Sequence, residues 1–208
     1  METNNLALIV RTMADTIIAN ENYFSELDGV VGDGDFGYSL ARGFEIVLQD
    51  WDALDNSSPS HFLKAISTII IGRVGGVSGI IWGTAFLRAS MTLATKIEVS
   101  KEDVIASFRN AVEGIQKRGQ AELGDKTLLD ALVPAINQLE ASFQKGEDSR
   151  SAIEAAAVVA RQSAEATRPM LAKRGRASYS GERSIGSLDA GAVAVAVLFE
   201  AVSKAWKA

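Results

Sequence analysis

The stretch Leu6–Ile18 reads LALIVRTMADTII and repeats its apolar residues at helical spacing. The apolar stripe consists of Leu6, Ile9, Val10, Met13, Ile17 and Ile18. Steps of three and four residues place such side chains on one face of an α-helix. Elsewhere the sequence has no alternating apolar and polar runs bounded by two-residue turns, so β-hairpins are not expected. The sequence therefore predicts an all-α protein.

The same period continues along the rest of the chain. It predicts further helices near residues 39–52, 61–72, 79–96, 101–118, 127–144, 149–172 and 190–206. Ser100 is a favoured N-cap residue, and Asp103 is placed to complete a capping box with it. Asp148 or Ser149 is suited to cap the helix that follows. We expect eight helices joined mostly by short loops.

Composition narrows the class of protein. The 208 residues fit a single domain spanning 1–208. Cysteine is absent, which excludes disulfides and thiolate metal sites and fits a reducing cytosol. The net charge of −5 argues against a nucleic-acid partner, because phosphate neutralisation needs basic surfaces.

Neither a membrane segment nor a signal peptide is expected. The longest uncharged run, Val74–Leu87, has 14 residues, and a membrane span needs about 20. The N-terminus lacks the basic start and apolar core of a signal peptide. These features predict a cytoplasmic protein with no membrane partner.

Glycine is concentrated in four segments, at 29–43, 72–83, 114–124 and 175–191. These segments follow the first, third, fifth and seventh predicted helices. In an up-and-down bundle, every second connection lies at the same end. The four glycine-rich loops are therefore predicted to gather at one end of the bundle.

The first of these loops, in LDGVVGDGDFG, carries the carboxylates of Asp28, Asp33 and Asp35 within eight residues. Glycine lets the backbone bend so that the three side chains converge. Converging carboxylate oxygens suit a hard cation such as Mg²⁺ or Ca²⁺. The spacing does not match an EF-hand. A solvated acidic loop with turn glycines is the alternative.

The second loop reads GRVGGVSG at 72–79 and runs into an apolar helix. Backbone N–H groups at the start of a helix form a ready anion site. The loop is neither a P-loop, since the Gly-Lys-Ser/Thr ending is missing, nor a dinucleotide fingerprint, since no strand precedes it. Close helix packing through glycine is the alternative interpretation.

The third loop reads RGQAELGDKT at 118–127, and Asp125 or Thr127 is its predicted N-cap. Taken alone, it is best explained as a helix start.

The fourth loop, KRGRASYSGERS at 173–184, places four cationic side chains in an acidic protein. Arginine suits phosphate binding, although a basic surface loop after a helix is also common. If the acidic and basic loops lie at the same end, they complement each other across a metal–polyphosphate ligand.

These loops resemble those of the L subunit of dihydroxyacetone kinase, over nearly the whole chain. The resemblance is carried by LDGVVGDGDFGYSLARGF, VGGVSGIIWGTAFLRA, RGQAELGDKTLLDAL and KRGRASYSGERSIGSLDAGA, in the same order and at similar separations. It implies an antiparallel up-and-down barrel of eight helices with the nucleotide site at one end. It also implies ATP or ADP bound with two Mg²⁺ ions as cofactors.

The resemblance assigns roles to individual residues. Asp28, Asp33 and Asp35 match the metal ligands, and Arg176 matches an arginine near the phosphates, so these four are the catalytic candidates. The further nucleotide-binding candidates are Ser39, Gly76, Val77, Ser78, Gly119, Thr127, Leu128, Asp189 and Gly191. Ser39 stands where the family usually has asparagine. Asp189 and Gly191 belong to the loop that closes over the nucleotide.

Two positions depart from the family pattern. Phe36 replaces the histidine of Gly-Asp-x-Asp-His-Gly, which lies beside the phosphates in the family, so one polar contact is expected to be lost. Ala190 replaces the proline of Asp-Pro-Gly, which is expected to loosen the closing loop. Because the metal ligands remain, we expect a changed site and not an inactive one.

The resemblance implies a kinase that works as one subunit of a complex. A separate K-type subunit would hold dihydroxyacetone or another small ketose, and this chain would transfer the phosphoryl group from Mg-bound ATP. A phosphotransferase-system form is the alternative, in which permanently bound ADP is rephosphorylated by a phosphohistidine protein, the M subunit. A nucleotide-sensing regulatory protein, altered by Phe36, is an alternative of another class. A homodimer stays open.

Overall fold

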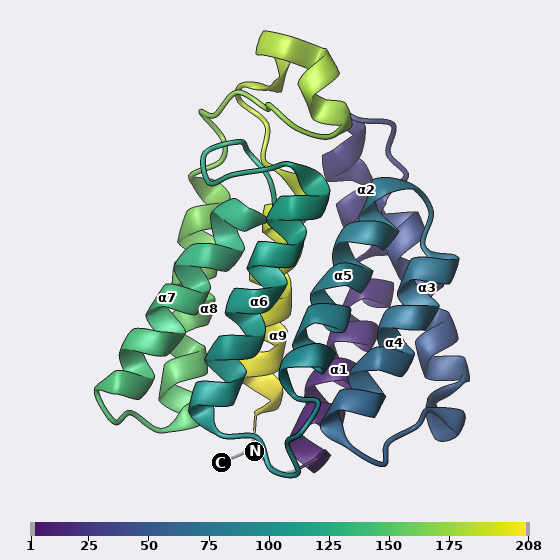
Figure 1. Cartoon of the computed structure of the whole chain (residues 1–208). Helices are drawn as coiled ribbons and strands as arrows, with labels where there is room; N and C mark the ends of the chain where they lie inside the picture. Colours follow the sequence, from purple (N-terminus) through teal and green to yellow (C-terminus); the bar gives the residue numbers. More distant parts are fainter. Residues whose placement is uncertain (1–2, 207–208) are drawn as a thin grey trace.

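The computed structural model describes residues 3–206, and over that range it contains helices and loops but no strand (Figure 1). Its α-helices are α1 (Thr3–Ala19), α2 (Glu21–Gly29), α3 (Phe36–Gln49), α4 (Pro59–Arg73), α5 (Gly76–Thr92), α6 (Lys101–Gly119), α7 (Leu129–Gln144), α8 (Ser149–Glu165) and α9 (Ala190–Ala205). Two 3₁₀ helices, η1 (Trp51–Ala53) and η2 (Arg176–Ser184), complete the described secondary structure. The predicted all-α class is confirmed.

The helices form a closed ring. Each helix from α3 onward packs against the next one along the chain, and α9 packs against α1. Helix α1 also packs against α3, and α2 continues along α3 beyond the end of α1. Counting α1 and α2 as one broken rod, the ring has eight antiparallel rods, as the sequence predicts (Figure 1).

Helix α2 is the main difference from the predicted helices, because the sequence predicts none between residues 18 and 39. At Asn20 the backbone leaves helical geometry, with φ −108° and ψ 15°. The Asn20 side-chain amide donates to the Thr16 carbonyl at 2.8 Å. Asparagine competes with the helix for backbone partners in this way. The short helix α2 then places Asp28, near its C-terminus, at the end of the barrel.

The helix ends follow the expected capping chemistry in two of the predicted places. Ser100 and Asp103 form the capping box of α6, and Asp148 caps α8 by accepting from the Ser151 N–H at 2.9 Å. The predicted helix at 149–172 is too long, because α8 ends at Glu165. There Thr167 turns its hydroxyl back onto the Ala164 carbonyl, at 2.6 Å.

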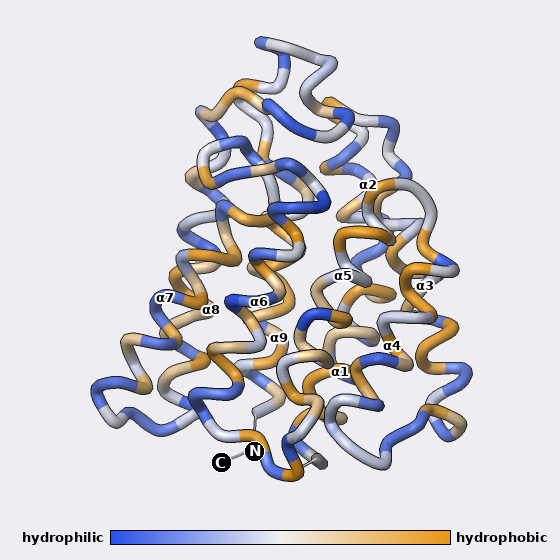
Figure 2. Tube along the Cα trace, in the orientation of Figure 1, coloured by the Kyte–Doolittle hydropathy of each residue, from blue (hydrophilic) through white to orange (hydrophobic). Residues whose placement is uncertain are grey.

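The inside of the barrel is apolar. Figure 2 shows apolar residues running along the helices and hydrophilic residues in many of the connecting segments. The ring encloses an apolar cavity of about 570 Å³, lined by side chains such as Leu6, Val10 and Phe86. Trp82, Ile115 and Leu128 line both this cavity and a second one at the end of the barrel. They therefore form the floor of the second cavity.

Among residues 3–206, no helix is both long and apolar enough to cross a membrane.

Close packing between α2 and α3 depends on Gly37. A methyl group at this buried position would collide with the Glu21 carbonyl oxygen and lie 2.7 Å from the Ser25 backbone nitrogen. Backbone atoms cannot move aside as a flexible side chain can. We expect Gly37→Ala to lower the free energy of unfolding by about 2 kcal/mol, measured by denaturant titration.

Gly72 provides the matched control. It is also helical, but it is exposed and a methyl group there would meet no atom within 4 Å. Gly72→Ala should leave stability unchanged or raise it by about 0.5–1 kcal/mol, because alanine favours the helix. Equal effects of the two substitutions would contradict the packing argument.

Candidate functional site

The four glycine-rich segments meet at one end of the barrel, around a cavity of about 310 Å³. This is the upper end in Figure 1, where the segment between α8 and α9 arches over the helix ends. Of the predicted site residues, those lining the cavity are Asp28, Asp33, Asp35, Gly76, Val77, Ser78, Gly119, Thr127, Leu128, Arg176, Asp189 and Gly191. Ser39 is the exception. It lies one turn into α3, and its hydroxyl faces the Gly75 backbone.

Three aspartates converge on one wall of the cavity. Asp28, Asp33 and Asp35 can each offer an oxygen such that all three atoms lie within 4.8 Å of one another. The turn that achieves this is closed by the Gly32 N–H, which donates to the Asp28 carbonyl at 2.6 Å. Gly34 then takes a positive φ of 74°, which glycine adopts without strain. Carboxylate oxygens at this spacing fit a hard cation such as Mg²⁺.

Asp35 precedes α3 without using its side chain as a cap, so its carboxylate stays available to the cluster.

Arg176 brings positive charge to the same cluster. Its guanidinium forms an ion pair with Asp33 and lies 3.4 Å from an Asp35 oxygen. The arginine is about half exposed, at 55%, so it is free to change partners. The ion pair joins the acidic loop to the segment between α8 and α9, as does the Ser180 hydroxyl, which donates to the Val31 carbonyl at 2.9 Å.

The glycine-rich turn before α5 forms another part of the cavity wall. Gly75, Gly76, Val77 and Ser78 line the cavity at the start of the helix. Gly76 has a φ of 63°, a conformation that favours glycine. The free N–H groups and the dipole of α5 therefore face the cavity and favour an anion there.

Glycine also allows close packing in the same helix. A methyl group at Gly79 would collide with the Val74 carbonyl, and one at Gly83 would collide with Ile71. The packing interpretation therefore holds for Gly79 and Gly83, and the anion site at the start of the helix stays a prediction.

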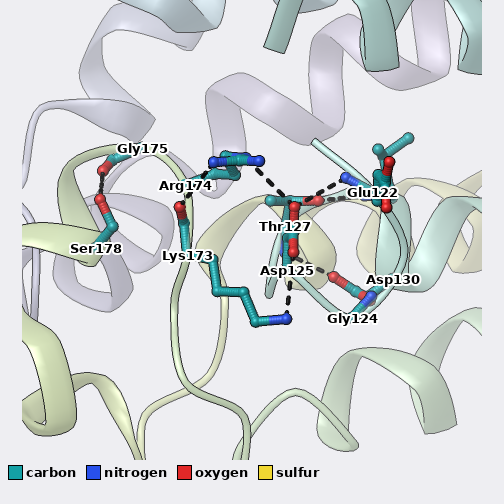
Figure 3. Close-up of polar contacts among 10 residues, drawn as sticks. Glu122, Gly124, Asp125, Thr127, Asp130, Lys173, Arg174, Gly175 and Ser178 are labelled. Carbon is teal, nitrogen blue, oxygen red and sulfur yellow. Dashed lines mark hydrogen bonds and ion pairs between the residues drawn. The ribbon is translucent and has the colours of Figure 1, made fainter. Parts of the chain in front are cut away.

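Two aspartates shape the loop before α7 (Figure 3). Asp130 accepts from the Gly124 N–H at 2.6 Å and from the Thr127 N–H at 2.7 Å. Asp125 accepts from the Glu122 N–H at 3.0 Å. The residue directly before α7 is Leu128, which makes no side-chain cap bond. The predicted cap Thr127 stands one residue earlier, and its hydroxyl accepts from the Leu129 N–H, the first of α7, at 3.2 Å. The aspartates bind N–H groups of the loop.

Asp125 also holds the lid, as we name residues 170–187. Its carboxylate lies 3.4 Å from the Lys173 ammonium and 3.3 Å from the Arg174 guanidinium (Figure 3). The hydrogen bond from Glu122, followed by that from Lys173, holds the pKa of Asp125 below its ordinary value, against the effect of burial. The lid was predicted as a loop, but the structure forms the 3₁₀ helix η2 there, interrupted at Gly181 with φ 55°.

Lys126 and Arg174 line the cavity and were not predicted as site residues. Lys126 is 2% exposed and has a φ of 60°, both unusual for lysine. The sequence contains no signal for either property. Arg174 could have been selected from the same basic run as Arg176.

Asp189 caps α9, where it accepts from the Ala192 N–H at 2.7 Å. Burial raises the pKa of Asp189 to about 7, and the charges of Asp130 and Asp28 act in the same direction. The hydrogen bond from Ala192 and the charge of Lys126 oppose this rise. This carboxyl group is therefore poised to titrate near neutral pH.

Comparisons with known proteins agree with this arrangement. A family model described as the DAK2 domain matches residues 30–204. The ADP-binding subunit of the PEP-dependent dihydroxyacetone kinase of Escherichia coli is 35% identical over 93% of this chain and 92% of its own length. The corresponding subunit of the PTS-dependent kinase of Lactococcus lactis is 36% identical, over 89% of this chain and 88% of its own.

A solved structure has the same fold. The dihydroxyacetone kinase of C. freundii in complex with AMP-PNP and Mg²⁺ matches 96% of this chain with a TM-score of 0.76 and 25% identity. The chain spans about a third of that structure's length, at 33%. It likewise covers 34% of the L-erythrulose kinase of Pectobacterium atrosepticum, to which it is 32% identical.

The raised pKa of Asp189 predicts a pH-dependent stability. The unfolded chain ionises this carboxyl near its ordinary pKa of 3.8, whereas the folded protein keeps it protonated up to about 7. The resulting stabilisation is complete below the lower value and is lost as the pH rises through the higher one. Asp189→Asn keeps an acceptor for the Ala192 N–H but cannot ionise.

The difference in unfolding temperature, variant minus wild type, should therefore grow by about 4 °C or more between about pH 5 and about pH 8. Differential scanning calorimetry without ligand measures it. A difference that does not change with pH would contradict the raised pKa.

Proposed function

The chain belongs to the DAK2-domain family, among the L subunits of dihydroxyacetone kinases, and we propose that it is the nucleotide-binding subunit of a cytoplasmic ketose kinase. The observation that carries this proposal is one cavity that combines three converging carboxylates, a helix N-terminus and an arginine. We assign the whole chain, 1–208, to this single domain. The acceptor is dihydroxyacetone or a related small ketose.

Asp28, Asp33 and Asp35 would hold magnesium. The donor set fits, since it consists only of carboxylate oxygens close enough to share a cation. Bound Mg²⁺ would neutralise the nucleotide phosphates and align them for in-line displacement. The sequence resemblance implies two ions.

In this proposal Arg176 has two sets of binding partners, the aspartates when no nucleotide is bound and the phosphates when one is. Its pairing with Asp33 and Asp35 competes with a cation for the same oxygens. With a cation held by these oxygens, the guanidinium would be available to the phosphates, since arginine's fork of donors fits anionic oxygens. The N-terminus of α5, which lines the same cavity, would hold the phosphates through its N–H groups. Catalysis then rests on positioning and charge.

The adenosine moiety would lie toward the floor of the cavity. Gly119, Thr127, Leu128 and Gly191 line that side, together with the apolar side chain of Trp82. A methyl group at Gly191 would lie 3.2 Å from the Leu128 side chain. The close approach of α9 to the start of α7 therefore shapes this part of the cavity.

The acceptor would come from another protein. No histidine is among the residues lining the cavity, and the chain's single histidine, His61, lies at the start of α4, at the opposite end of that helix from the cavity. Phosphoryl transfer still requires an acceptor hydroxyl held in line with the phosphates. We therefore assign the ketose to a K-type partner subunit that docks on the nucleotide end. Homodimerisation stays an open alternative.

Two phosphoryl sources fit the site. The sequence slightly favours exchangeable ATP. However, the E. coli and Lactococcus lactis relatives are both ADP-binding subunits of kinases that depend on PEP or the PTS. Their coverage of almost the whole chain supports the form with resident ADP and a phosphohistidine M subunit as phosphoryl donor.

Nucleotide release distinguishes the two sources. Protein purified in Mg²⁺ without added nucleotide is denatured, and the supernatant is analysed by ion-exchange chromatography. Stoichiometric ADP is the result expected for the resident-coenzyme form. An empty protein that then binds Mg-ATP reversibly would assign the ATP-dependent form. Binding of neither nucleotide would refute the kinase proposal and favour a regulatory role.

Removing one metal ligand tests the assignment of the cluster. Asp33→Ala should weaken Mg-ADP binding by more than ~100-fold, since even changes outside the first ligand shell cost 10–100-fold in metal affinity. Titration calorimetry measures the affinity, and circular dichroism should show unchanged helix content. Asp52→Ala, at an exposed position in η1, is the charge-matched control and should bind normally. Retained affinity in Asp33→Ala would refute the metal site.

The role of Phe36 can be tested by restoring the family histidine. Phe36 lines the cavity, is 9% exposed and packs on Phe24 with ring centroids 6.2 Å apart. Phe36→His should tighten Mg-ADP binding about threefold by adding a polar contact to phosphate. It should also lower stability by about 1–2 kcal/mol through lost packing. Unchanged affinity would mean that the site already compensates for phenylalanine.

A further inference from the structure

The lid, residues 170–187, is an 18-residue segment. Backbone carbonyls at both of its ends accept hydrogen bonds from one buried side chain, that of Lys126. The Lys126 ammonium donates to the Met170 carbonyl at 3.1 Å, at the start of the lid. It also donates to the carbonyls of Ser184 and, at 2.8 Å, Ser187, at the end of the lid. An ammonium group has three hydrogens, so these three carbonyls use its whole donor capacity.

This bonding pattern is unusual for a buried cation. Buried lysines are normally paired with a carboxylate, whereas Lys126 forms no ion pair within the described part of the chain and bonds to carbonyls instead. Burial lowers the pKa of Lys126, and the charge of Asp189 partly offsets this. The backbone is also held in the left-handed region, with φ 60°. A side chain kept in such a position is over-determined by its surroundings.

The two ends of the lid, 170–172 and 184–187, which together we call its neck, are also joined without Lys126. The Ser184 hydroxyl accepts from the Ala172 N–H at 3.0 Å, and the Gly186 N–H donates to the Arg168 carbonyl at 2.8 Å. These bonds join the same two ends of the lid. Among the described residues, the Lys126 side chain is the one that donates hydrogen bonds from the loop before α7 to both ends of the lid.

The lid carries the cations of the nucleotide cavity. Arg174 and Arg176 line the cavity from a segment that begins and ends at the Lys126 ammonium. The neighbouring residue, Asp125, binds the Arg174 side chain, and its carbonyl accepts from the Lys173 N–H at 3.1 Å. The pair Asp125–Lys126 thus fixes one flank and the neck of the lid.

We propose that Lys126 is a positioning residue for phosphate binding. By bonding to both ends of the lid, it closes the neck and holds the Arg176 side chain where it can bind the phosphates. The proposal rests on the proposed nucleotide site. Lys126 acts through Arg176 and is not assigned a contact with substrate. Its removal should free the lid while the ring of helices stays intact.

Limited trypsin digestion of the full chain tests the neck directly, because the lid contains four cleavage sites. These are Lys173, Arg174, Arg176 and Arg183. Lys126→Met should raise the rate of cleavage within the lid at least about tenfold, since local opening exposes these sites. Mass spectrometry of the fragments should place the new cuts in the lid and not in the helices.

Lys101→Met is the matched control. The Lys101 ammonium also donates to a backbone carbonyl, that of Glu147 at 2.7 Å, but it lies at the start of α6, at the other end of the barrel. This substitution should leave lid cleavage unchanged. If Lys126→Met does not yield folded protein, Lys126→Gln, which keeps two donors, should show the same lid cleavage to a smaller degree.

A double-mutant cycle separates positioning from general stability. In the wild type, Arg176→Ala should weaken Mg-ADP binding about tenfold, whereas in the Lys126→Met background it should cost less than about threefold. The reason is that, without Lys126, the Arg176 side chain is no longer held beside the phosphates. Titration calorimetry supplies all four affinities.

The outcomes decide the proposal. Lid cleavage unchanged in Lys126→Met, or additive losses of affinity, would overturn the positioning role. A wild type that binds no Mg-ADP would refute the proposed function, while the cleavage contrast between Lys126→Met and Lys101→Met would still decide whether Lys126 closes the neck.

Discussion

Three carboxylates whose oxygens lie within 4.8 Å of one another repel strongly, and the nucleotide end of this barrel is arranged around that repulsion. The cluster requires positive charge, and Arg176 supplies it from a segment about 140 residues further along the chain. In the proposed function, the same charge would let the cluster hold a divalent cation. The acidic loop and the lid are therefore one electrostatic unit, although they are far apart in sequence.

The helical ring provides the geometry for this unit. Three of the connections at the nucleotide end are short and tied to helix ends, as where Gly37 lets α3 approach α2 closely. The fourth, between α8 and α9, spans 166–189 and is long for a loop in a compact domain. A segment of that length needs internal bonds to keep one shape. Its neck at Lys126 and its flank at Asp125 provide them.

Sequence reasoning succeeded where one physical rule dominates. Apolar periodicity gave the eight rods, the Ser100 capping box was visible as a motif, and the order of the helices brought the glycine-rich loops to one end. It failed where single side chains compete with the backbone. The break at Asn20 depends on one side-chain amide, and the loop before α7 depends on aspartates that bind its N–H groups.

Lys126 could not have been found from pattern, because lysine is normally exposed and its partners here are carbonyls, which every residue has.

The cavity also explains why this chain would need a partner. Its polar groups are of the kind that bind charge: carboxylates for a cation, and N–H groups and guanidinium groups for an anion. Phe36 strengthens this character, because it places an aromatic ring against Phe24 where the family has a titratable histidine. Groups of these kinds can align and neutralise a phosphoryl group. In the proposed function, selecting the acceptor and activating its hydroxyl would then fall to the protein that docks on this end.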